Sequence, residues 1–456
     1  MRRLFRVQNR ASIKELGTEP IGKLLLKYSV PAVIGTLSVS LYNIIDRIFI
    51  GQGISAYAIA GLAITFPIMM FLQAFGTLVG VGAASRISIV LGMRKRRLAE
   101  AILGNAVILT LFFWVILSGL GLIFLDDLLR AFGASVNTLQ YAKEFMVIVI
   151  PAGIFSNIAF GLASVMRATG YPQKSMTAIV LGVVVNTILA PVFIFGFDMG
   201  IQGAATATAI AMFISSFFVL SHFFDIHSEI RFTPRAFRLR WSIISNIVSI
   251  GMAPFLMNLV ASGIVVFVNQ QLFRYGGDLA IGAYGIVISY VNVFIMTIIG
   301  ICQGMQPIVG YNYGAGQRER MKRTLMLTIK VAISINAIGF ILALCIPGAL
   351  TKLFSSDLEL IEKTKVGLRY MFLMFPLVGF QVVLANFFQS IGKAQLSIFM
   401  SLSRQVLFYL PCLYTFPIFF DLIGIWISSP VSDLLSVIVA FIVMQHQKKI
   451  FTEGKL

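Results

Sequence analysis

Twelve long apolar stretches fill most of this chain, and they constrain its fold more than any other feature. A helix that spans the hydrocarbon core of a bilayer needs about 20 predominantly apolar residues. None of the stretches shows the alternation of polar and apolar residues that is typical of a half-buried strand. They cover residues 24–50, 58–85, 98–124, 138–168, 174–197, 201–223, 244–272, 279–309, 321–347, 362–391, 395–419 and 422–445. We therefore predict an all-α polytopic membrane protein with twelve transmembrane helices.

The composition excludes a soluble protein. Of the 456 residues, 58% are hydrophobic and only 12% are charged, whereas soluble proteins have about 25% charged residues. The 36 Lys and Arg residues outnumber the 18 Asp and Glu residues, which in a soluble protein would suggest nucleic-acid binding. In a membrane protein the same excess is typical of cytoplasmic loops, so we expect a lipid bilayer as the partner and no nucleic acid.

The charges of the loops predict the orientation of the chain. Basic residues collect before the first apolar stretch and after every even-numbered one, as in Arg94–Arg97 and Arg318–Arg323. The connections after odd-numbered stretches are poor in Lys and Arg; residues 51–57, for example, carry no charge. Because cytoplasmic loops carry the excess of Lys and Arg, this alternation predicts that both termini are cytoplasmic.

The chain repeats itself at a spacing of about 222 residues. Pro31 corresponds to Pro254, and Gly170 corresponds to Gly392. Similar matches keep the same order along the whole chain, which chance identities do not do.

The repeat predicts two lobes of six spans each. Because six is even, both halves enter the membrane in the same direction, and a pseudo-twofold axis along the membrane normal should relate them. We expect an N-lobe in residues 1–223, a cytoplasmic linker in residues 224–243 and a C-lobe in residues 244–456. Transporters are often built from such repeats, with the substrate site between them.

Asp46 is the strongest candidate for a functional residue. It lies in the last third of the first stretch, within SLYNIIDRIFIG. A carboxylate well inside a span costs about 2.5–3.5 kcal/mol on insertion scales, so it is expected to face protein or water. Burial favours the protonated form of a carboxyl group, which suits a proton carrier. The alternative is an interfacial Asp46 paired with Arg47 or solvated.

Other polar residues in the first half accompany Asp46. Asn43 lies one turn before it, Asn186 lies in the fifth stretch, and Thr206 and Thr208 lie in the sixth. We expect these residues to line a cavity in the N-lobe, although each alone is more typical of contacts between membrane helices. Pro31 removes a backbone hydrogen bond inside the first span, so it is a candidate hinge.

The second half offers a separate polar site. Arg404 lies in the eleventh stretch and Asp433 near the middle of the twelfth, and Asn269 occupies the repeat position of Asp46. Two interpretations of Asp433 are equally open, an ion pair with Arg404 or a second cation site. Arg404 could also extend toward the membrane interface.

At this point the sequence resembles the multidrug and toxic compound extrusion (MATE) transporters, most of all the bacterial branch with the DinF-like and MepA-like pumps. The resemblance covers nearly the whole chain. It rests on LYNIIDRIFIGQG, RATGYPQKSM, GFDMGIQGAATATAIA, GICQGMQPIVGYNYGAGQ and SLSRQVLFYLP. It implies two six-helix lobes in a V, and export driven by entry of protons or sodium ions in a bacterial cytoplasmic (inner) membrane.

The resemblance also implies residue roles. Asp46 matches the family's coupling carboxylate in the N-lobe, Asn186 and Thr208 match the polar residues around it, and Pro31 matches the kinking proline. Many relatives have a second Asp where this chain has Ala190. Sodium favours several oxygen ligands, so this departure favours H⁺ as the coupling ion, with Na⁺ as the alternative.

We therefore predict an ion-driven multidrug efflux antiporter that exports organic cations or amphipathic compounds in exchange for H⁺. The sequence contains no metal-ligand cluster, no nucleophile–base pair and no phosphate-binding P-loop sequence, so we predict no enzyme, no metal site and no cofactor besides the coupling ion. A flippase or exporter of a lipid-linked or other amphipathic metabolite is the alternative. We expect a monomer.

Overall fold

The computed structural model describes residues 13–54, 56–352, 354, 357–447 and 449–452, and it consists of helices without a strand in these ranges. At a few helical positions, Asn43 among them, only the backbone is described. The first half contains α1 (Glu15–Thr18), α2 (Ile21–Gly53), α3 (Ala56–Gly92), α4 (Arg96–Ile123), α5 (Leu125–Ala131), α6 (Val136–Ala168), α7 (Pro172–Pro191) with the π-helix η1 (Val192–Gly196), and α8 (Gly200–Phe224).

The second half follows the 3₁₀-helix η2 (Pro234–Phe237). It contains α9 (Trp241–Gly314), α10 (Arg318–Cys345), α11 (Pro347–Lys352), α12 (Leu358–Met371), α13 (Phe375–Ser390), α14 (Ala394–Leu402), the π-helix η3 (Ser403–Tyr409), α15 (Leu410–His446) and α16 (Lys449–Thr452). Helix α9 breaks at Gly277, where φ is 66°, and α15 breaks at Asp421, where φ is 47°. Each of these two helices therefore turns back within its own length.

The described helices give twelve membrane crossings. Ten helical segments are long and apolar enough to span a bilayer, and the bent pair α12–α13 provides an eleventh span. One of the ten, Ala394–His446, has 53 residues, or roughly 80 Å of helix at 1.5 Å per residue. This length suffices for two crossings, and the break at Asp421 divides it. The predicted fold class is confirmed.

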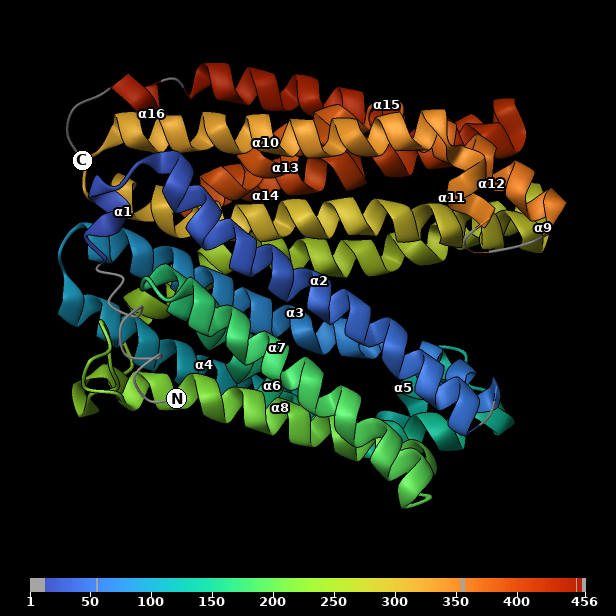
Figure 1. The fold of residues 1–456 in the computed structure, drawn as a ribbon, viewed down its shortest axis with the longest axis horizontal. Helices are drawn as coiled ribbons and strands as arrows, with labels where there is room; N and C mark the ends of the chain where they lie inside the picture. The colour runs from blue at the N-terminus through green and yellow to red at the C-terminus, as the bar shows by residue number, and fades with distance from the viewer. Residues whose placement is uncertain (1–12, 55, 353, 355–356, 448, 453–456) are drawn as a thin grey trace.

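The helices form two groups, α2–α8 and α9–α15, as Figure 1 shows. The groups lie close together at the end that holds α1 and α16, called here the α1/α16 end. They spread apart toward the opposite end, which holds α5 and α12 (Figure 1). The V shape implied by the resemblance is therefore present.

The internal repeat is visible in how the two groups touch. Gly92 at the end of α3 lies directly against the backbone carbonyl of Tyr311, and Gly314 at the end of α9 lies directly against that of Ile89. Gly92 and Gly314 are repeat partners, and so are Ile89 and Tyr311. The two contacts are thus reciprocal, as a pseudo-twofold axis requires. A side chain at either glycine would force the lobes apart.

Helix α2 crosses from one lobe to the other. Its first turns, with Leu24 and Tyr28, are buried in a core cluster with Met305 of the C-lobe. Farther along, Gly35 lies against Ile179 of α7 in the N-lobe. The first turns of α9 make the reciprocal crossing, because Ile247 is buried among N-lobe residues.

Buried asparagines fasten the segments that lead into these two crossing helices. Asn105 of α4 donates to the carbonyl of Arg238 (3.0 Å) and accepts from the amide of Arg240 (3.0 Å), which fixes the segment before α9. Asn312 of α9 donates to the carbonyl of Leu16 in α1 (2.9 Å), which fixes the segment before α2. Each lobe therefore holds the start of a helix that continues into the other lobe.

Candidate functional site

Asp46 lies on the face of α2 that is turned toward the core of the N-lobe. Residues one turn apart on a helix share a face, and both of its neighbours at this spacing point inward. Tyr42 reaches Thr208 of α8 with its hydroxyl group (3.4 Å). Ile50 is fully buried in a cluster that includes Ala190 of α7. The carboxylate oxygen Oδ1 of Asp46 is buried as well, so the predicted position of Asp46 inside the lobe agrees with the structure.

A chain of three polar side chains runs beside Asp46 across three helices. The side-chain amide of Asn186 on α7 donates to the hydroxyl of Thr208 on α8 (2.9 Å). Thr208 also contacts the hydroxyl of Tyr42, and Tyr42 interacts electrostatically with Asp46. Asn186 and Thr208 are 3% and 4% exposed. We call Tyr42, Asp46, Asn186 and Thr208 the N-lobe polar cluster.

Local sequence explains how α7 and α8 meet at this cluster. Gly203, one turn and a half before Thr208, packs directly against the backbone of Phe193, and the residues around it, Ala204, Ala205 and Ala207, are fully buried. Small residues let membrane helices approach closely. Beyond Pro191 the chain continues as η1; π-helical turns are frequent at functional sites.

The cluster contains a single carboxylate. Ala190, at the position where the resemblance implies a second Asp, is fully buried in the apolar core. No group of three His, Cys, Asp or Glu side chains that could hold a metal occurs in the searched, described part of the chain. The arrangement offers one group that changes charge on protonation, surrounded by a phenol, an amide and a hydroxyl that remain neutral. It is therefore suited to exchange a proton for a cation.

One predicted member of the cavity, Thr206, does not join the cluster. The hydroxyl of Thr206 donates to the carbonyl of Gln202 in its own helix (2.7 Å). Residues two apart on a helix point in different directions, so Thr206 and Thr208 could not both face Asp46. Asn43 lies in α2, but its side chain is outside the described part of the structure.

Pro31 lies where α2 passes from the C-lobe to the N-lobe. On either side of it, Ser29 donates to the carbonyl of Ile301 (3.3 Å) and Thr36 donates to the carbonyl of Met296 (3.1 Å), both in α9. Pro31 is buried, and α2 continues through it as a helix. This is the position at which a bend would move the Asp46 end of α2 relative to the C-lobe, so Pro31 remains our candidate hinge.

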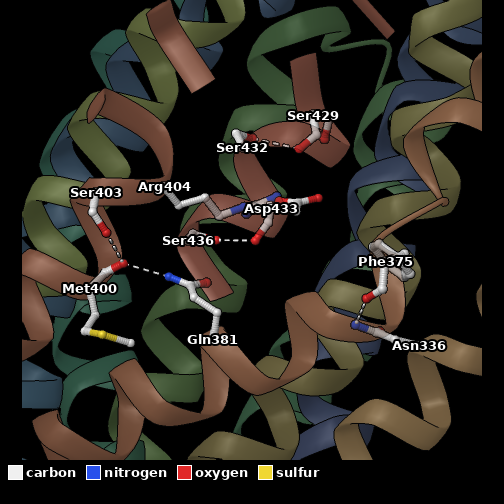
Figure 2. A network of polar contacts seen from close by, with 10 residues as sticks. All are labelled: Asn336, Phe375, Gln381, Met400, Ser403, Arg404, Ser429, Ser432, Asp433 and Ser436. Atoms are coloured by element: carbon white, nitrogen blue, oxygen red, sulfur yellow. Dashed lines mark hydrogen bonds and ion pairs between the residues drawn. The ribbon is translucent and has the colours of Figure 1, made fainter. Parts of the chain in front are cut away.

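The C-lobe contains an ion pair. Nε of Arg404 in η3 donates to Oδ1 of Asp433 in α15 at 2.6 Å. Figure 2 shows the two side chains pointing toward each other between their helices. The side chain of Asp433 is 2% exposed and that of Arg404 is 23% exposed. Of the two interpretations of Asp433, the structure shows the ion pair with Arg404.

Asn269 does not join this pair. It is exposed on the first part of α9, and within the described residues it forms no hydrogen bond with Arg404 or Asp433. The predicted C-lobe group of three is therefore a group of two. Gln381 of α13 lies nearby instead, donating to the carbonyl of Met400 (2.7 Å; Figure 2).

Sequence reasoning missed Tyr42 and Gln405. Tyr42 stands one helical turn before Asp46, a spacing that could have identified it, but aromatic residues are common in any span. Gln405 directly follows Arg404, and both line a pocket in the C-lobe. The polar side chain of Gln405 could have identified it from the sequence, because a polar residue within a span is expected to face protein or a cavity.

Known proteins share this architecture. A sequence profile of the MatE family matches residues 31–192 and again residues 246–415. The chain belongs to the MATE family. The two matches fall in the two halves of the repeat, so both lobes of this MATE-family protein carry the family pattern.

Curated relatives are similar over almost their whole length. Multidrug export protein MepA of Staphylococcus aureus (strain MSSA476) is 26% identical over 425 residues, which cover 93% of this chain and 94% of the relative. Multidrug export protein MepA of Staphylococcus haemolyticus (strain JCSC1435) is 27% identical over 435 residues, which cover 95% and 96%. The match to each relative thus includes both lobes of this MATE-family protein.

Solved structures share the fold. "Crystal structure of MATE in the bent conformation" has a TM-score of 0.92 and 23% identity, covering 97% of this chain and 98% of that chain. A MOP superfamily transporter from Pyrococcus furiosus has a TM-score of 0.90 and 23% identity, with coverage of 97% and 98%. The fold of this MATE-family protein is therefore that of known multi-pass membrane proteins.

Proposed function

We propose that this MATE-family protein is a multidrug efflux transporter that exports organic cations or amphipathic compounds in exchange for protons. The observation that carries the proposal is the N-lobe polar cluster, in which the carboxyl group of Asp46 lies beside neutral Tyr42, Thr208 and Asn186. Support comes also from relatives named multidrug export protein MepA. No enzymatic step is needed for this function.

The chemistry follows from the charge of Asp46. The ionised carboxylate attracts a cation in a region of low dielectric constant, where charge interactions are strong. Protonation removes that charge, and the cation loses its partner. A transporter must bind its ligands with different affinities in its two conformations, and one carboxyl group visited in turn by proton and substrate supplies the difference. Bending of α2 at Pro31 would connect protonation with movement of the lobe.

Protons are the proposed coupling ion because the cluster contains one carboxylate. Asp46, Asn186 and Thr208 together offer oxygen ligands, but Ala190 contributes none. Binding of a hard cation strengthens with the number of charged oxygen ligands. A proton requires only one basic oxygen. Na⁺ coupling is the alternative, and the experiment below separates the two ions.

The proposed orientation places the α1/α16 end in the cytoplasm of a bacterium. Arg96, at the start of α4, and Arg318 and Arg320, at the start of α10, lie at this end, where α3 and α9 meet. Asp126 and Asp127 lie in α5 at the opposite end (Figure 1). The positive-inside rule assigns the basic end to the cytoplasm. The lobes spread at the other end (Figure 1), so the described conformation would be open to the outside.

Transport in proteoliposomes tests the proposal. The purified protein is reconstituted, and uptake of a fluorescent organic cation is followed under an imposed pH gradient, an imposed Na⁺ gradient or neither, for the wild type and Asp46→Asn. We expect uptake that requires the pH gradient and disappears in Asp46→Asn. Thr206→Val, a substitution outside the cluster, is the control and should transport like the wild type.

Two other results would overturn the proposal in different ways. Uptake driven only by the Na⁺ gradient would assign coupling to sodium, although Asp46 could still take part. No uptake of any cation under either gradient would reject drug efflux and favour export or flipping of an amphipathic metabolite instead.

A further inference from the structure

The segment that joins the two lobes ends in a short row of alternating apolar and basic residues. Residues 237–241 read Phe-Arg-Leu-Arg-Trp, and we call them the linker strip. The backbone is extended at Arg238 (φ −73°, ψ 116°) and at Arg240 (φ −133°, ψ 111°). Side chains of an extended segment point alternately to opposite sides. Arg238 and Arg240 therefore share one side of the strip, and Leu239 lies on the other.

The apolar side chains of the strip are not covered by the rest of the protein. Phe237, Leu239 and Trp241 are 41%, 63% and 80% exposed. The ring of Phe237 packs against Phe232 (5.5 Å), which in turn packs against exposed Phe224 at the end of α8 (5.2 Å). A continuous exposed apolar surface of this kind marks a site of contact with another protein or with a membrane.

The contact with α4 indicates the depth of the strip in the membrane. Buried Asn105 of α4 holds the backbone of Arg238 and Arg240. Leu111 and Phe112, farther along α4, are exposed as side chains that face lipid are. Leu111 follows Asn105 by six residues, or about 9 Å of helix. The strip therefore lies beside the edge of the hydrocarbon core, at the α1/α16 end of the molecule (Figure 1).

The basic side chains around the strip lack an anionic partner in the protein. Four arginines of the linker are exposed and form no ion pair with a carboxylate of the described residues, namely Arg231, Arg235, Arg238 and Arg240. A further basic group adjoins them, because Arg96 of α4 donates to the carbonyl of Ser228 (3.3 Å). Guanidinium groups bind phosphate oxygens through paired hydrogen bonds. The surface thus offers phosphate-binding groups next to exposed apolar side chains.

We propose that the linker strip binds anionic phospholipids of the leaflet that faces the cytoplasm in the proposed orientation. Arg238 and Arg240 contact the lipid phosphates, and Phe237, Leu239 and Trp241 enter the boundary between headgroups and acyl chains. Apolar side chains that insert at this boundary and basic residues near an anionic surface both strengthen membrane binding. Free phosphate would engage only the basic side of the strip, whereas a phospholipid engages both sides.

A role in orienting the chain alone does not explain the strip. The positive-inside rule requires basic residues in cytoplasmic loops, but it requires no alternation with exposed aromatic residues. It also requires no fixed backbone, whereas Asn105 bonds to the backbone on both sides of Leu239. The proposal does not depend on the transported compound or on the coupling ion.

Trp241 provides a reporter for the test. Of the three tryptophans, Trp114 and Trp426 are buried and only Trp241 is exposed. Bromine atoms on an acyl chain quench the fluorescence of a tryptophan that they contact. The full-length protein is reconstituted in phosphatidylcholine bilayers that contain a minor fraction of brominated phosphatidylglycerol or of brominated phosphatidylcholine. Trp241→Phe gives the background from the two buried tryptophans.

We expect phosphatidylglycerol to be preferred beside Trp241 by at least about fivefold, the value of one arginine at an anionic surface. High salt should reduce this preference, because it screens exposed charges. Arg238→Gln/Arg240→Gln should lower the preference below about twofold. Arg238→Lys/Arg240→Lys keeps both charges and should keep most of the preference.

A matched control separates the strip from the general charge of this surface. Lys322→Gln/Arg323→Gln removes two exposed basic residues at the start of α10, the same change in charge at the same end of the molecule. It should leave the lipid preference at Trp241 unchanged. All of these substitutions are at exposed side chains, so they leave the helix packing intact.

Three results would overturn the proposal. Equal quenching of the wild type by the two brominated lipids would show a strip that enters the bilayer without selecting anionic lipids. Quenching no stronger than in Trp241→Phe would show a strip that stays in water and would favour an acidic protein as its partner. Equal losses in the Arg238/Arg240 and Lys322/Arg323 glutamine variants would assign the preference to net charge. None of these results bears on transport at Asp46, so failure here is distinguishable from failure of the proposed function.

Discussion

The two lobes share one architecture, yet their buried carboxylates have opposite surroundings. In the N-lobe, Asp46 lies beside the neutral groups of Tyr42, Thr208 and Asn186. In the C-lobe, Asp433 is held by the guanidinium of Arg404 at 2.6 Å. A nearby cation favours the ionised form of a carboxyl group and burial disfavours it, so the partners described for the two carboxyl groups differ in their electrostatic effect. Under the proposed function, proton exchange is assigned to the carboxyl group of the N-lobe, whereas the carboxyl group of the C-lobe is assigned to its ion pair with Arg404.

The two halves of the repeat therefore share a fold but differ in the polar side chains of their interiors. At the 222-residue spacing that relates Gly170 to Gly392, Arg404 corresponds to Gly182. Gly182 packs against Ser215 of α8, so two N-lobe helices are in contact where the C-lobe has an arginine. Asn186 corresponds in turn to Phe408. Contacts between lobes, as at Gly92 and Gly314, have stayed reciprocal, while the polar interiors have diverged.

Charge removal should affect the stability of the lobes very differently. Removing one partner of a buried ion pair costs about 3–5 kcal/mol, so Asp433→Asn should lower the stability strongly, and Arg404→Gln/Asp433→Asn should recover most of the loss. Asp46→Asn should change stability by less than about 1 kcal/mol, because asparagine keeps the size of the side chain and can hydrogen-bond to the neutral groups beside it. Thermal unfolding in detergent, followed by a dye that reacts with buried Cys302 and Cys412, measures the difference. Equal shifts for Asp46→Asn and Asp433→Asn would contradict it.

A second carboxylate should change the ion preference of the N-lobe. Ala190→Asp adds a charged oxygen ligand to the lobe of Asp46 and should make transport respond to a Na⁺ gradient, with roughly a tenfold gain in Na⁺ affinity for one added charge, or about 1.4 kcal/mol. Ala190→Asn adds similar volume without charge and should give no response to Na⁺. Transport by both variants under Na⁺ and pH gradients is the measurement. A Na⁺ response of the asparagine variant would show that volume, not charge, is responsible.

Two threonines on one helix provide a finer test of the polar cluster. Thr208→Val removes the hydroxyl that links Asn186 with Tyr42, so it should weaken cation binding about fivefold, the value of one hydrogen bond of about 1 kcal/mol. Thr206→Val removes only a hydrogen bond to the carbonyl of Gln202 and should leave binding unchanged. Affinities for a rhodamine methyl ester, a fluorescent organic cation, decide this prediction. If both variants weaken binding alike, the cluster does not contribute to the cation site as proposed.

Substitution of the candidate hinge should affect rate more than binding. Pro31→Ala restores a helical hydrogen-bond donor where α2 changes lobes, which should slow transport about threefold and leave the affinity for the cation unchanged, as expected for a conformational step. Pro67→Ala, in the first third of α3, is the matched control and should transport at the wild-type rate. Initial rates in proteoliposomes measure both. An equal effect at Pro67 would remove the special role of Pro31.

Much of the fold follows from the sequence because each span is a local pattern. The twelve apolar stretches correspond to the helices of the structure, with ends that differ by a few residues. Short helices such as α5 and α11 were missed, since seven and six residues give little periodicity. The crossing of α2 into the C-lobe was not predicted either, because it depends on contacts between residues about 270 positions apart, as between Ser29 and Ile301.

The site was predictable where a residue type alone restricts its surroundings. A carboxylate in a span must face protein or water, so Asp46 could be identified from sequence. The pairing of Arg404 with Asp433 stayed open because they belong to different helices, and only packing decides which side chains meet. Thr206 and Thr208 were grouped by sequence proximity although the helical period separates their directions.

The central claim is that a proton and a cation alternate at Asp46, and calorimetry tests it most directly. Binding of a rhodamine methyl ester to the purified protein is titrated in buffers with different enthalpies of ionisation, which gives the number of protons released. At a pH where Asp46 is largely protonated, we predict release of about one proton per cation by the wild type and none by Asp46→Asn, with Asp433→Asn/Arg404→Gln releasing as many as the wild type. Undiminished proton release by Asp46→Asn would contradict the account.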